Sequence, residues 1–340
     1  METTTLKDQY LAYKTQNPKM RIRDIASALG VSEAELLMTE VGENVVILQE
    51  PFEELLQQIP SLGYVMALTR NEYCVHERKG IYQNISFTPH AGLVLGADID
   101  LRLFINQWKI GFAVAGNGPR SFQFFDGKGT AVHKIYLTEK SDEQQYHALA
   151  EGFRKAEQLA FPINATVAAI RSEKPDMEVD STAFQAAWLA MRDTHEFFGI
   201  LKRFGLNRTQ ALRLAPKGFS KEISIGLFKK VMENCSGQKI PVMVFVANAG
   251  CIQIHTGPIQ RLVQMGPWFN ILDPEFNLHL KEDAIAAVWH VVKPSADGDV
   301  NSLELFDNTG ELIVQVFGKR KPGQAELSEW RSLLSTKEII

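Results

Sequence analysis

His195 is the residue whose surroundings suggest chemistry most directly. It lies in the stretch MRDTHEFFGILKRFG, Met191–Gly205, with Asp193 and Glu196 beside it. If this stretch is helical, spacings of four and three residues put His195 on one face with apolar side chains, namely Phe184, Trp188, Met191 and Phe198. Such a histidine is either a core residue whose ring is hydrogen-bonded internally, or a ligand for a flat apolar cofactor. Haem fits the second alternative, because a porphyrin needs an apolar slot and its iron needs an axial nitrogen.

Arg102 is the second candidate, in DIDLRLFINQW. Strand alternation places Leu101 and Leu103 on one face and Arg102 on the other, beside Asp100 and Phe104. Arg102 is then either a solvated residue in a surface ion pair, or an arginine that points into a cleft. In a cleft it could hold water or an oxygen-derived ligand.

A third group lies near the C-terminus, in HVVKPSADG and IVQVFGKR. Gln315 and Phe317 are expected on one face of a strand, and Arg320 follows a glycine that permits a turn. Lys293 adds a second cation. Two cations near one sheet edge suit a ligand with two carboxylates, such as haem with its propionates. Taken singly, each is equally explained as a solvated residue at a strand end.

The composition excludes several classes of protein. The chain has 340 residues, 45% hydrophobic and 22% charged, which is typical of a globular protein and long enough for two domains. A net charge of −4 provides no basic excess, so nucleic-acid binding is not expected. The N-terminus lacks the apolar segment of a signal peptide, and no apolar run is long enough to cross a membrane. An odd count of cysteines with no close pair (Cys74, Cys235 and Cys251) fits a reducing cytoplasm better than a disulfide framework.

An internal repeat divides the chain into two halves. RNEYCVHERKG (70–80) aligns with ANAGCIQIHTG (247–257), and DIDLRLF (98–104) aligns with EFNLHLK (275–281) at the same offset. Further on, SFQFFDGKG (121–129) aligns with SLELFDNTG (302–310). The order is kept and the period is far too long for a solenoid, so a duplicated domain is indicated. We expect halves at 1–170 and 181–340, joined by a charged linker at 171–180. His195 aligns near Asn17, so a ligand role at this position was not duplicated.

Each half is predicted to be α+β, with helices first. In the first half these are Leu6–Thr15, Ile22–Leu29 and a short helix capped by Ser32. In the second half they are a long helix, Thr182–Phe204, and a short helix capped by Asn207. Strand-like runs follow without intervening helices, which predicts a large antiparallel sheet in each half. FFDGKGT and FDNTGE are predicted hairpin turns.

These motifs closely resemble the bacterial haemin-transport and haem-degrading proteins of the HemS/ChuS type. The similarity runs in order through nearly the whole chain, in RNEYCVHERKG, DLRLFINQW, QFFDGKG, MRDTHEFF, VMVFVANAGCIQIHTG, GPWFNILDPEFNLHL and SLELFD. The resemblance implies two similar halves, each with a large antiparallel sheet and a helical cluster. It also implies a haem cleft toward the C-terminal half.

The resemblance assigns roles to the candidates as well. It makes His195 the axial ligand of the haem iron, and it makes Arg102 the catalytic residue that approaches the other haem face. Residues matching those that contact the propionates are Lys293, Gln315 and Arg320, with Arg208 in LNRTQAL as a further candidate. Phe317 stands where some relatives have tyrosine, which removes a hydrogen bond worth about 1 kcal/mol to a propionate or to water.

Three functions are compatible with these residues. The first is a cytoplasmic protein of haem uptake that binds haem, opens its macrocycle oxidatively and releases iron. No flavin or nicotinamide fingerprint is present, so electrons would come from an external donor, for example one linked to NAD(P)H. The second is a carrier that stores haem and delivers it to a separate haem oxygenase. A third is a sheet-based protein that binds another apolar acid.

The expected partners follow from the first two functions. They are haem itself, a haem importer on the cytoplasmic side of the membrane, or a downstream haem oxygenase. The duplicated sheets also offer edges through which a homodimer could form.

Overall fold

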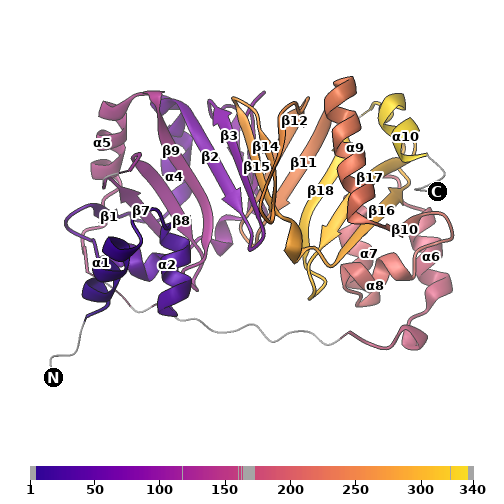
Figure 1. The fold of residues 1–340 in the computed structure, drawn as a ribbon, viewed down its shortest axis with the longest axis horizontal. Coiled ribbons are helices and arrows are strands. Elements are labelled where there is room, and N and C mark those ends of the chain that lie inside the picture. Colours follow the sequence, from indigo (N-terminus) through magenta and orange to yellow (C-terminus); the bar gives the residue numbers. More distant parts are fainter. Residues whose placement is uncertain are drawn as a thin grey trace. The chain divides into compact units, whose positions relative to one another are not determined.

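The structure is a computed structural model that describes residues 5–116, 118–159, 161, 163, 173–321 and 323–335 (Figure 1). The chain forms two compact units that follow its two halves, 1–168 and 169–340, except that each unit contains a short segment from the other half. Asn248–Gln253 belongs to the first unit and Asn71–His76 to the second. Of the predicted linker, residues 171 and 172 lie outside the described residues. The rest belongs to the second unit, where Lys174 donates to the Phe204 carbonyl oxygen (2.6 Å).

Three of the five helices described in the first unit, α1 to α3, begin close to the predicted positions. The five are α1 (Leu6–Gln16), α2 (Ile22–Leu29), α3 (Glu33–Met38), α4 (Phe52–Gln58) and α5 (Glu143–Gly152). The predicted cap at Ser32 is confirmed, because its hydroxyl accepts from the Glu35 backbone while the Glu35 carboxylate accepts from the Ser32 backbone. The helices α4 and α5 have no counterpart in the sequence prediction.

An antiparallel sheet forms the body of the first unit. Its strand order is β1 (Val45–Ile47), β7 (Ile110–Val114), β8 (Ser121–Phe125), β9 (Ala131–Ser141) and β2 (Gly63–Arg70). A further antiparallel run consists of β4 (Ile85–Phe87), β5 (Gly92–Leu95) and β6 (Asp100–Leu103). The predicted turn in FFDGKGT is confirmed: Asp126 and Thr130 pair (3.0 Å) and Gly129 adopts a φ of +75°.

The second unit repeats this arrangement. Its sheet has the order β10 (Ser220–Ile223), β16 (Ala287–Lys293), β17 (Val300–Phe306), β18 (Leu312–Gly318) and β11 (Val242–Ala247). A further run consists of β13 (Leu262–Met265), β14 (Trp268–Leu272) and β15 (Phe276–Lys281). The turn in FDNTGE is also confirmed, with Gly310 at a φ of +81°. The common strand order confirms the α+β class and the duplication.

The remaining elements complete the chain. β3 (Cys74–Gly80) and β12 (Cys251–Gly257) each begin within an exchanged segment. The helices of the second unit are α6 (Ser181–Leu189), α7 (Glu196–Phe204), α8 (Arg208–Arg213), α9 (Ile225–Gln238) and α10 (Ser328–Leu334). Short 3₁₀ helices are η1 (Ile59–Leu62), η2 (Ile105–Gln107), η3 (Asp176–Glu178) and η4 (Glu282–Ala284). No helix in the described ranges combines the length and the apolar character needed to span a membrane.

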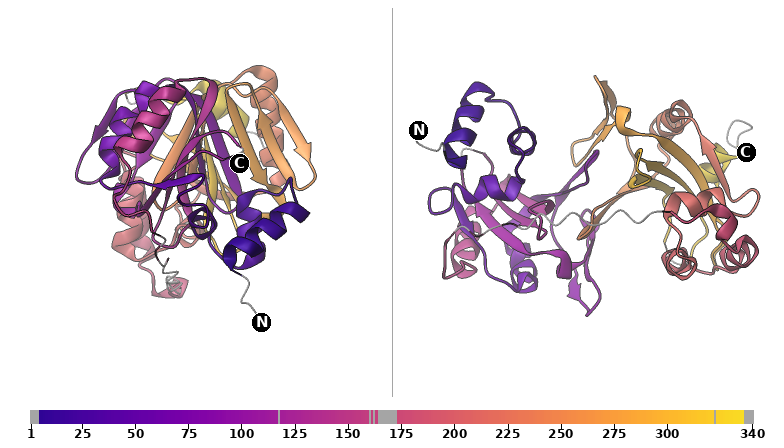
Figure 2. Two further views of the ribbon diagram at one scale, coloured as in Figure 1. Left: turned by 90° about the vertical axis from the view of Figure 1, so that its left-hand side faces the viewer. Right: turned by 90° about the horizontal axis from the view of Figure 1, so that it is seen from below.

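Helices cover both faces of the sheet in the second unit. Along β16, Trp289 and Val291 pack with the cluster formed by α6, α7 and α8, whereas Val288 packs with the cluster that includes α9. Figure 1 shows α9 lying across β11 and β18, and the view from below in Figure 2 shows helices on either side of this sheet. The face under α6–α8 is the one that concerns the candidate site.

The predicted single helix Thr182–Phe204 is wrong, because a turn separates α6 from α7. The Asp193 carboxylate accepts from the backbone N–H of His195 (2.8 Å), and the Glu196 carboxylate accepts from the backbone N–H of Asp193 (3.0 Å). These two acids bind backbone amides of the turn and so stabilise the break ahead of α7, which begins at Glu196. The predicted end at Gly205 is confirmed, since this glycine is the left-handed C-cap of α7.

Candidate ligand-binding site

His195 does not lie in the apolar stripe that its spacing predicted. It is the N-cap of α7, and its side chain is 92% exposed. The predicted neighbours Trp188 and Met191 are buried as expected, but the turn between α6 and α7 rotates the imidazole out of the core. Phe198, predicted on the same apolar face, is 76% exposed. The second unit therefore presents an imidazole and an aromatic ring three residues apart on its surface.

Asp193 holds one nitrogen of the His195 ring. Its carboxylate lies 2.6 Å from Nδ1, and the backbone N–H of His195 lowers the pKa of this carboxyl, with the ring and Arg320 adding to the effect. Because an ionised carboxylate can only accept, Nδ1 carries the proton and Nε2 keeps its lone pair. This arrangement fixes the orientation of the ring and leaves Nε2 as the nitrogen that can bind a metal. The i−2 contact is possible only because the helix is interrupted here.

Phe197 of α7 packs against a group of charged residues. Its ring is buried and packs against Trp188 at 4.8 Å between centroids. Lys293 Nζ lies 4.6 Å from the centroid of the same ring, and the Arg208 guanidinium lies 5.4 Å from it. Two of the predicted ligand-binding cations, Arg208 and Lys293, thus lie against the ring of Phe197, which is two residues after His195 in the sequence.

Glu304 is the residue on which these cations converge, and no sequence motif pointed to it. Its carboxylate is fully buried and accepts from both Nε and Nη2 of Arg208 (2.7 and 2.9 Å), and from Lys293 Nζ (2.6 Å). Gln315 and Ser302 also donate to it (3.0 and 3.2 Å). Strand alternation in SLELF was a usable signal, since it places Glu304 opposite the apolar Leu303 and Leu305.

The burial of this group changes its ionisation. Burial alone would raise the pKa of Glu304, but the charges of Arg208 and Lys293 outweigh it and hold that pKa well below its usual range. Burial lowers the pKa of Lys293 to about 8, although Glu304 opposes this shift. At neutral pH Glu304 and Lys293 are therefore both charged, and two cationic side chains share one carboxylate.

Gln315, Phe317 and Arg320 lie where the sequence placed them. Gln315 and Phe317 pair with Glu304 and Ser302 across β17 and β18, so all four side chains share one sheet face. Arg320 follows the end of β18 and lies 3.6 Å from Asp297.

The loop that carries Asp297 is connected to the turn before His195. In this loop the backbone N–H of Ala296 donates to the carbonyl oxygen of Arg192 (2.8 Å). Arg320 also acts electrostatically on Asp193. Arg320 thus places a positive charge close enough to the His195 turn to act on Asp193.

Arg102 lies in the first unit, on β6. Leu101 and Leu103 are fully buried and Arg102 is one-third exposed, so the predicted alternation is confirmed. Its guanidinium binds the Asp100 carboxylate and the Leu101 carbonyl. This is the ion pair that the simpler alternative predicted; a role in a cleft stays a prediction.

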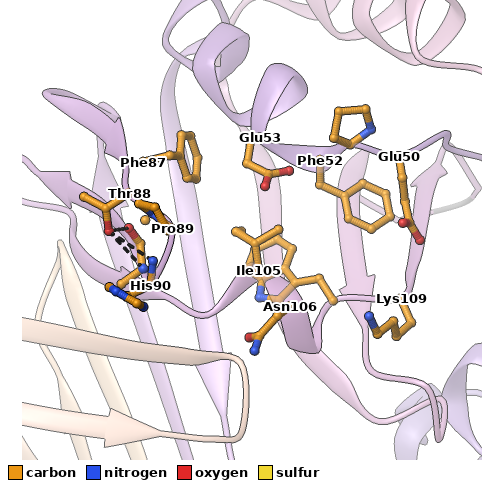
Figure 3. A pocket seen from close by; sticks show the side chains of 14 residues that line it. Glu50, Phe52, Glu53, Phe87, Thr88, Pro89, His90, Ile105, Asn106 and Lys109 are labelled. Carbon is orange, nitrogen blue, oxygen red and sulfur yellow. Dashed lines mark hydrogen bonds between the residues drawn. The ribbon is translucent and has the colours of Figure 1, made fainter.

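A separate cavity of about 360 Å³ occurs in the first unit (Figure 3). Its walls include the start of α4, with Phe52 and Glu53, and the β4–β5 turn, where Thr88 binds the carbonyl oxygen of Ala91 (3.0 Å). Glu50, Glu53 and Lys109 supply its charges. None of the predicted ligand-binding residues lines this cavity, and its excess of carboxylates does not suit an anionic ligand.

The residues of the second unit fit a particular kind of ligand. A single imidazole nitrogen supplies one bond, so it suits a metal that brings its other ligands with it. Phe198 and Leu189, which is 50% exposed, offer apolar contact, and Arg208 and Arg320 offer positive charge. An iron porphyrin with carboxylate side chains meets all three conditions.

Comparison with known proteins supplies an independent finding. The model of the haemin-degrading HemS/ChuX domain matches residues 30–153 and again residues 205–336. The chain belongs to the HemS family. The double match agrees with the two units, because each contains one copy of the family's domain.

Relatives of this HemS-family chain match it over nearly its whole length. It is 38% identical to the haemin transport protein HmuS of Yersinia pestis, covering 97% of this chain and 96% of that protein. It is 45% identical to the haem-binding protein PhuS of Pseudomonas aeruginosa in its haem-loaded form, with a TM-score of 0.94 and 97% of both chains covered. It is 36% identical to the haem-degrading enzyme ChuS of Escherichia coli O157:H7, with a TM-score of 0.89 and 97% of both chains covered.

Proposed function

We propose that this protein binds haem through Nε2 of His195 and opens the macrocycle oxidatively, so that iron is released. The observation that carries the proposal is the exposed imidazole whose Nδ1 is bound by Asp193. The relatives support it, since PhuS binds haem and ChuS degrades it. The proposed site of action is the cytoplasm, where a haem importer or a downstream oxygenase would be the partner.

The chain's own residues would each contribute a separate interaction. His195 gives the axial bond, and the exposed Phe198 and Leu189 give the porphyrin apolar contact. Arg208 and Arg320 bind the propionates, with Gln315 beside them, and Phe317 packs against Phe245 at 5.1 Å without a hydroxyl to add. Lys293 is only 4% exposed, so it acts from behind Arg208.

The oxidative step requires groups that the site beside His195 does not supply. Bound haem would supply the oxygen chemistry, and an external donor would supply the electrons. Arg102, from the first unit, is proposed to polarise the oxygen-derived ligand. That role rests on the family resemblance.

A carrier that stores haem and passes it to another oxygenase is the second candidate. It is favoured by the 92% exposure of His195, because a ligand held by one exposed axial bond is readily released. Both candidates use the same residues for binding and differ only in the fate of the bound haem.

A haemin titration in two stages tests the proposal. The Soret band of haemin should shift on binding to the wild-type protein and should shift differently, with weaker binding, for His195→Ala. His147→Ala, which removes a half-exposed histidine of the first unit, serves as the control and should match the wild type. Equal spectra and affinities for His195→Ala and the wild type would show that His195 is not the ligand.

The second stage separates the two candidates. A reductant is added to the haem complex with catalase present, so that free peroxide does not attack the porphyrin. Loss of the Soret band with a bile-pigment-like product supports the degrading function. A Soret band that persists, followed by transfer of haem to an acceptor protein, supports the carrier.

A further inference from the structure

We propose that Glu304 is a positioning residue of the haem-carboxylate site: it aligns Arg208 for one carboxylate of the ligand and keeps Lys293 charged behind it. The inference rests on the proposed function, because it concerns the same ligand. It goes further by giving a role to a residue that is fully buried and touches no ligand.

The alignment follows from how Arg208 is bound. Glu304 accepts from Nε and Nη2, which is the bidentate geometry that fixes the plane of a guanidinium. Because this edge of Arg208 is occupied, the edge formed by Nη1 and the second N–H of Nη2 is left for a further acceptor. The Arg208 side chain is 26% exposed and that of Lys293 only 4%. Arg208 is therefore the member of the group that a ligand can reach.

The first unit provides an internal comparison. There Glu33 is buried and paired with Arg70 (2.7 Å) and with Lys134. Glu33 is the first residue of α3, and Arg208 is the first residue of the corresponding helix α8. The polarity is thus inverted: the helix carries the acid in the first unit and the base in the second.

The inversion points to a ligand. A cluster that only stabilised the fold would be satisfied by either polarity. In the second unit, which also contains His195, the residue on the helix is a cation, Arg208, and it is partly exposed. A partly exposed cation can bind a carboxylate of a ligand, and this explains the polarity of the cluster, which packing alone does not.

Glu304 also determines whether Lys293 is charged. Two cations and one carboxylate leave one net positive charge, which matches one carboxylate of a ligand. Lys293 Nζ faces Glu304 of β17, Arg208 of α8 and the ring of Phe197 on α7. Without Glu304 the buried ammonium would lose its proton near neutral pH. The Glu304→Gln variant would then keep one net positive charge, on Arg208, but the Arg208 guanidinium would no longer be held in a fixed orientation.

The test compares haemin with haemin dimethyl ester, which has the same iron but no carboxylates. Dissociation constants of both are measured in mild detergent between pH 6.5 and 9, and their ratio isolates the contribution of the carboxylates. In the wild type the ratio should favour haemin and decline above pH 8, as Lys293 loses its proton. In Glu304→Gln this ratio should be roughly tenfold smaller, because Arg208 is no longer aligned for a charged hydrogen bond to the ligand carboxylate. The ratio should also be independent of pH, because Lys293 is already uncharged.

Two further variants make the result decisive. Glu33→Gln removes the equivalent buried carboxylate of the first unit and should keep the wild-type ratio. If Glu304→Gln does not fold, the double variant Glu304→Gln/Lys293→Met removes one charge of each sign, and it should show the same small, flat ratio. A wild-type ratio and pH profile in whichever of these Glu304 variants folds would overturn the proposal.

The proposal on Glu304 and the proposed function fail in different ways. If the wild type binds haemin and its dimethyl ester equally, the carboxylates are not recognised and the role of Glu304 is wrong, while haem binding stands. If haemin binds the wild type and His195→Ala identically, the assigned iron ligand is wrong instead. An unchanged Soret position in Glu304→Gln is expected, because His195 remains the ligand.

Discussion

The residues that define the candidate site act in pairs, each made of a carboxylate and the functional group that it holds. Asp193 holds Nδ1 of His195 so that Nε2 stays available, and Glu304 holds one edge of Arg208 so that the edge of Nη1 and Nη2 stays available. In both cases a carboxylate binds one side of a functional group and leaves another side to a ligand. Preorganisation of this kind lowers the entropic cost of binding.

The proposed role of Arg102 is also that of a single residue, and kinetic measurements test it. Arg102→Ala should weaken haemin binding less than about threefold but slow the reductant-driven loss of the Soret band by more than tenfold, since it would act on charge that develops during the reaction. Arg78→Ala removes a comparable arginine–aspartate pair of the first unit, with Asp98 at 2.5 Å, and should affect neither. Weak binding with a normal rate for Arg102→Ala would assign it to binding instead.

The element that matters most is the turn between α6 and α7. It converts a run of helical spacing into two helices and places His195 at the start of the second. The side chain of Glu196 stabilises the turn by accepting from the backbone N–H groups of Arg192 and Asp193 (3.3 and 3.0 Å). The direction of the imidazole therefore depends on a helix start.

Glu196→Ala tests this dependence. It should lower the free energy of unfolding by about 1 kcal/mol, the usual value for a lost cap, and weaken haemin binding about threefold to tenfold with an unchanged Soret position. Glu35→Ala removes the equivalent bond at the start of α3 in the first unit. It should cost the same stability, measured by urea unfolding, and leave haemin affinity as it is. Equal losses of affinity in the two variants would show a general effect of stability.

At this scale the sequence predicted much of the fold and only part of the site. α2 and the caps at Ser32, Gly205 and Asn207 lie where their local signals placed them, because caps are determined by a few adjacent residues. The break before α7 was missed, because the spacing of Trp188, Met191, His195 and Phe198 continues across it. The Asp-x-x-Glu pattern of Asp193 and Glu196 was the competing signal.

The alignment of the two halves shows a similar limit. The C-caps Gly30 and Gly205 put His195 opposite Met20 rather than Asn17, since the helix boundaries were not known from the sequence. Glu304 was missed for another reason. The donors that surround it come from α8, β16 and β18, and no local pattern reveals such a convergence.

At the scale of the whole molecule, the two units share their strand order but differ in what they bury. In the first unit His133 is fully buried, with Tyr82 at 2.6 Å from Nε2 and Thr69 at 2.8 Å from Nδ1. The aligned position in the second unit is Val314, in an apolar core. Duplicated halves have therefore diverged in their interiors as well as at the candidate site.

This difference gives the first unit a sensitivity to acid. Burial lowers the pKa of His133 to about 3, whereas an unfolded histidine titrates near 6.5. Between these values the unfolded state binds the extra proton, so the free energy of unfolding should fall as the pH falls from 6.5 toward 3, by up to about 1.4 kcal/mol per pH unit. His133→Val should flatten this slope in urea titrations, while costing about 1–3 kcal/mol at pH 7 because two buried hydroxyls lose a partner. A slope as steep as that of the wild type would assign the acid sensitivity to other groups.

The exchanged segments have a consequence for how the chain can be divided. Asn248 donates to the carbonyl oxygens of Arg70 and Val132 in the first unit, and Asn71 donates to those of Ala247 and Ile313 in the second. A gene cut between the halves would yield two fragments, each lacking a piece of its own unit and carrying a piece of the other. We therefore expect the halves to depend on each other for folding, so that neither copy could be expressed, transferred or lost alone without leaving the other unit incomplete.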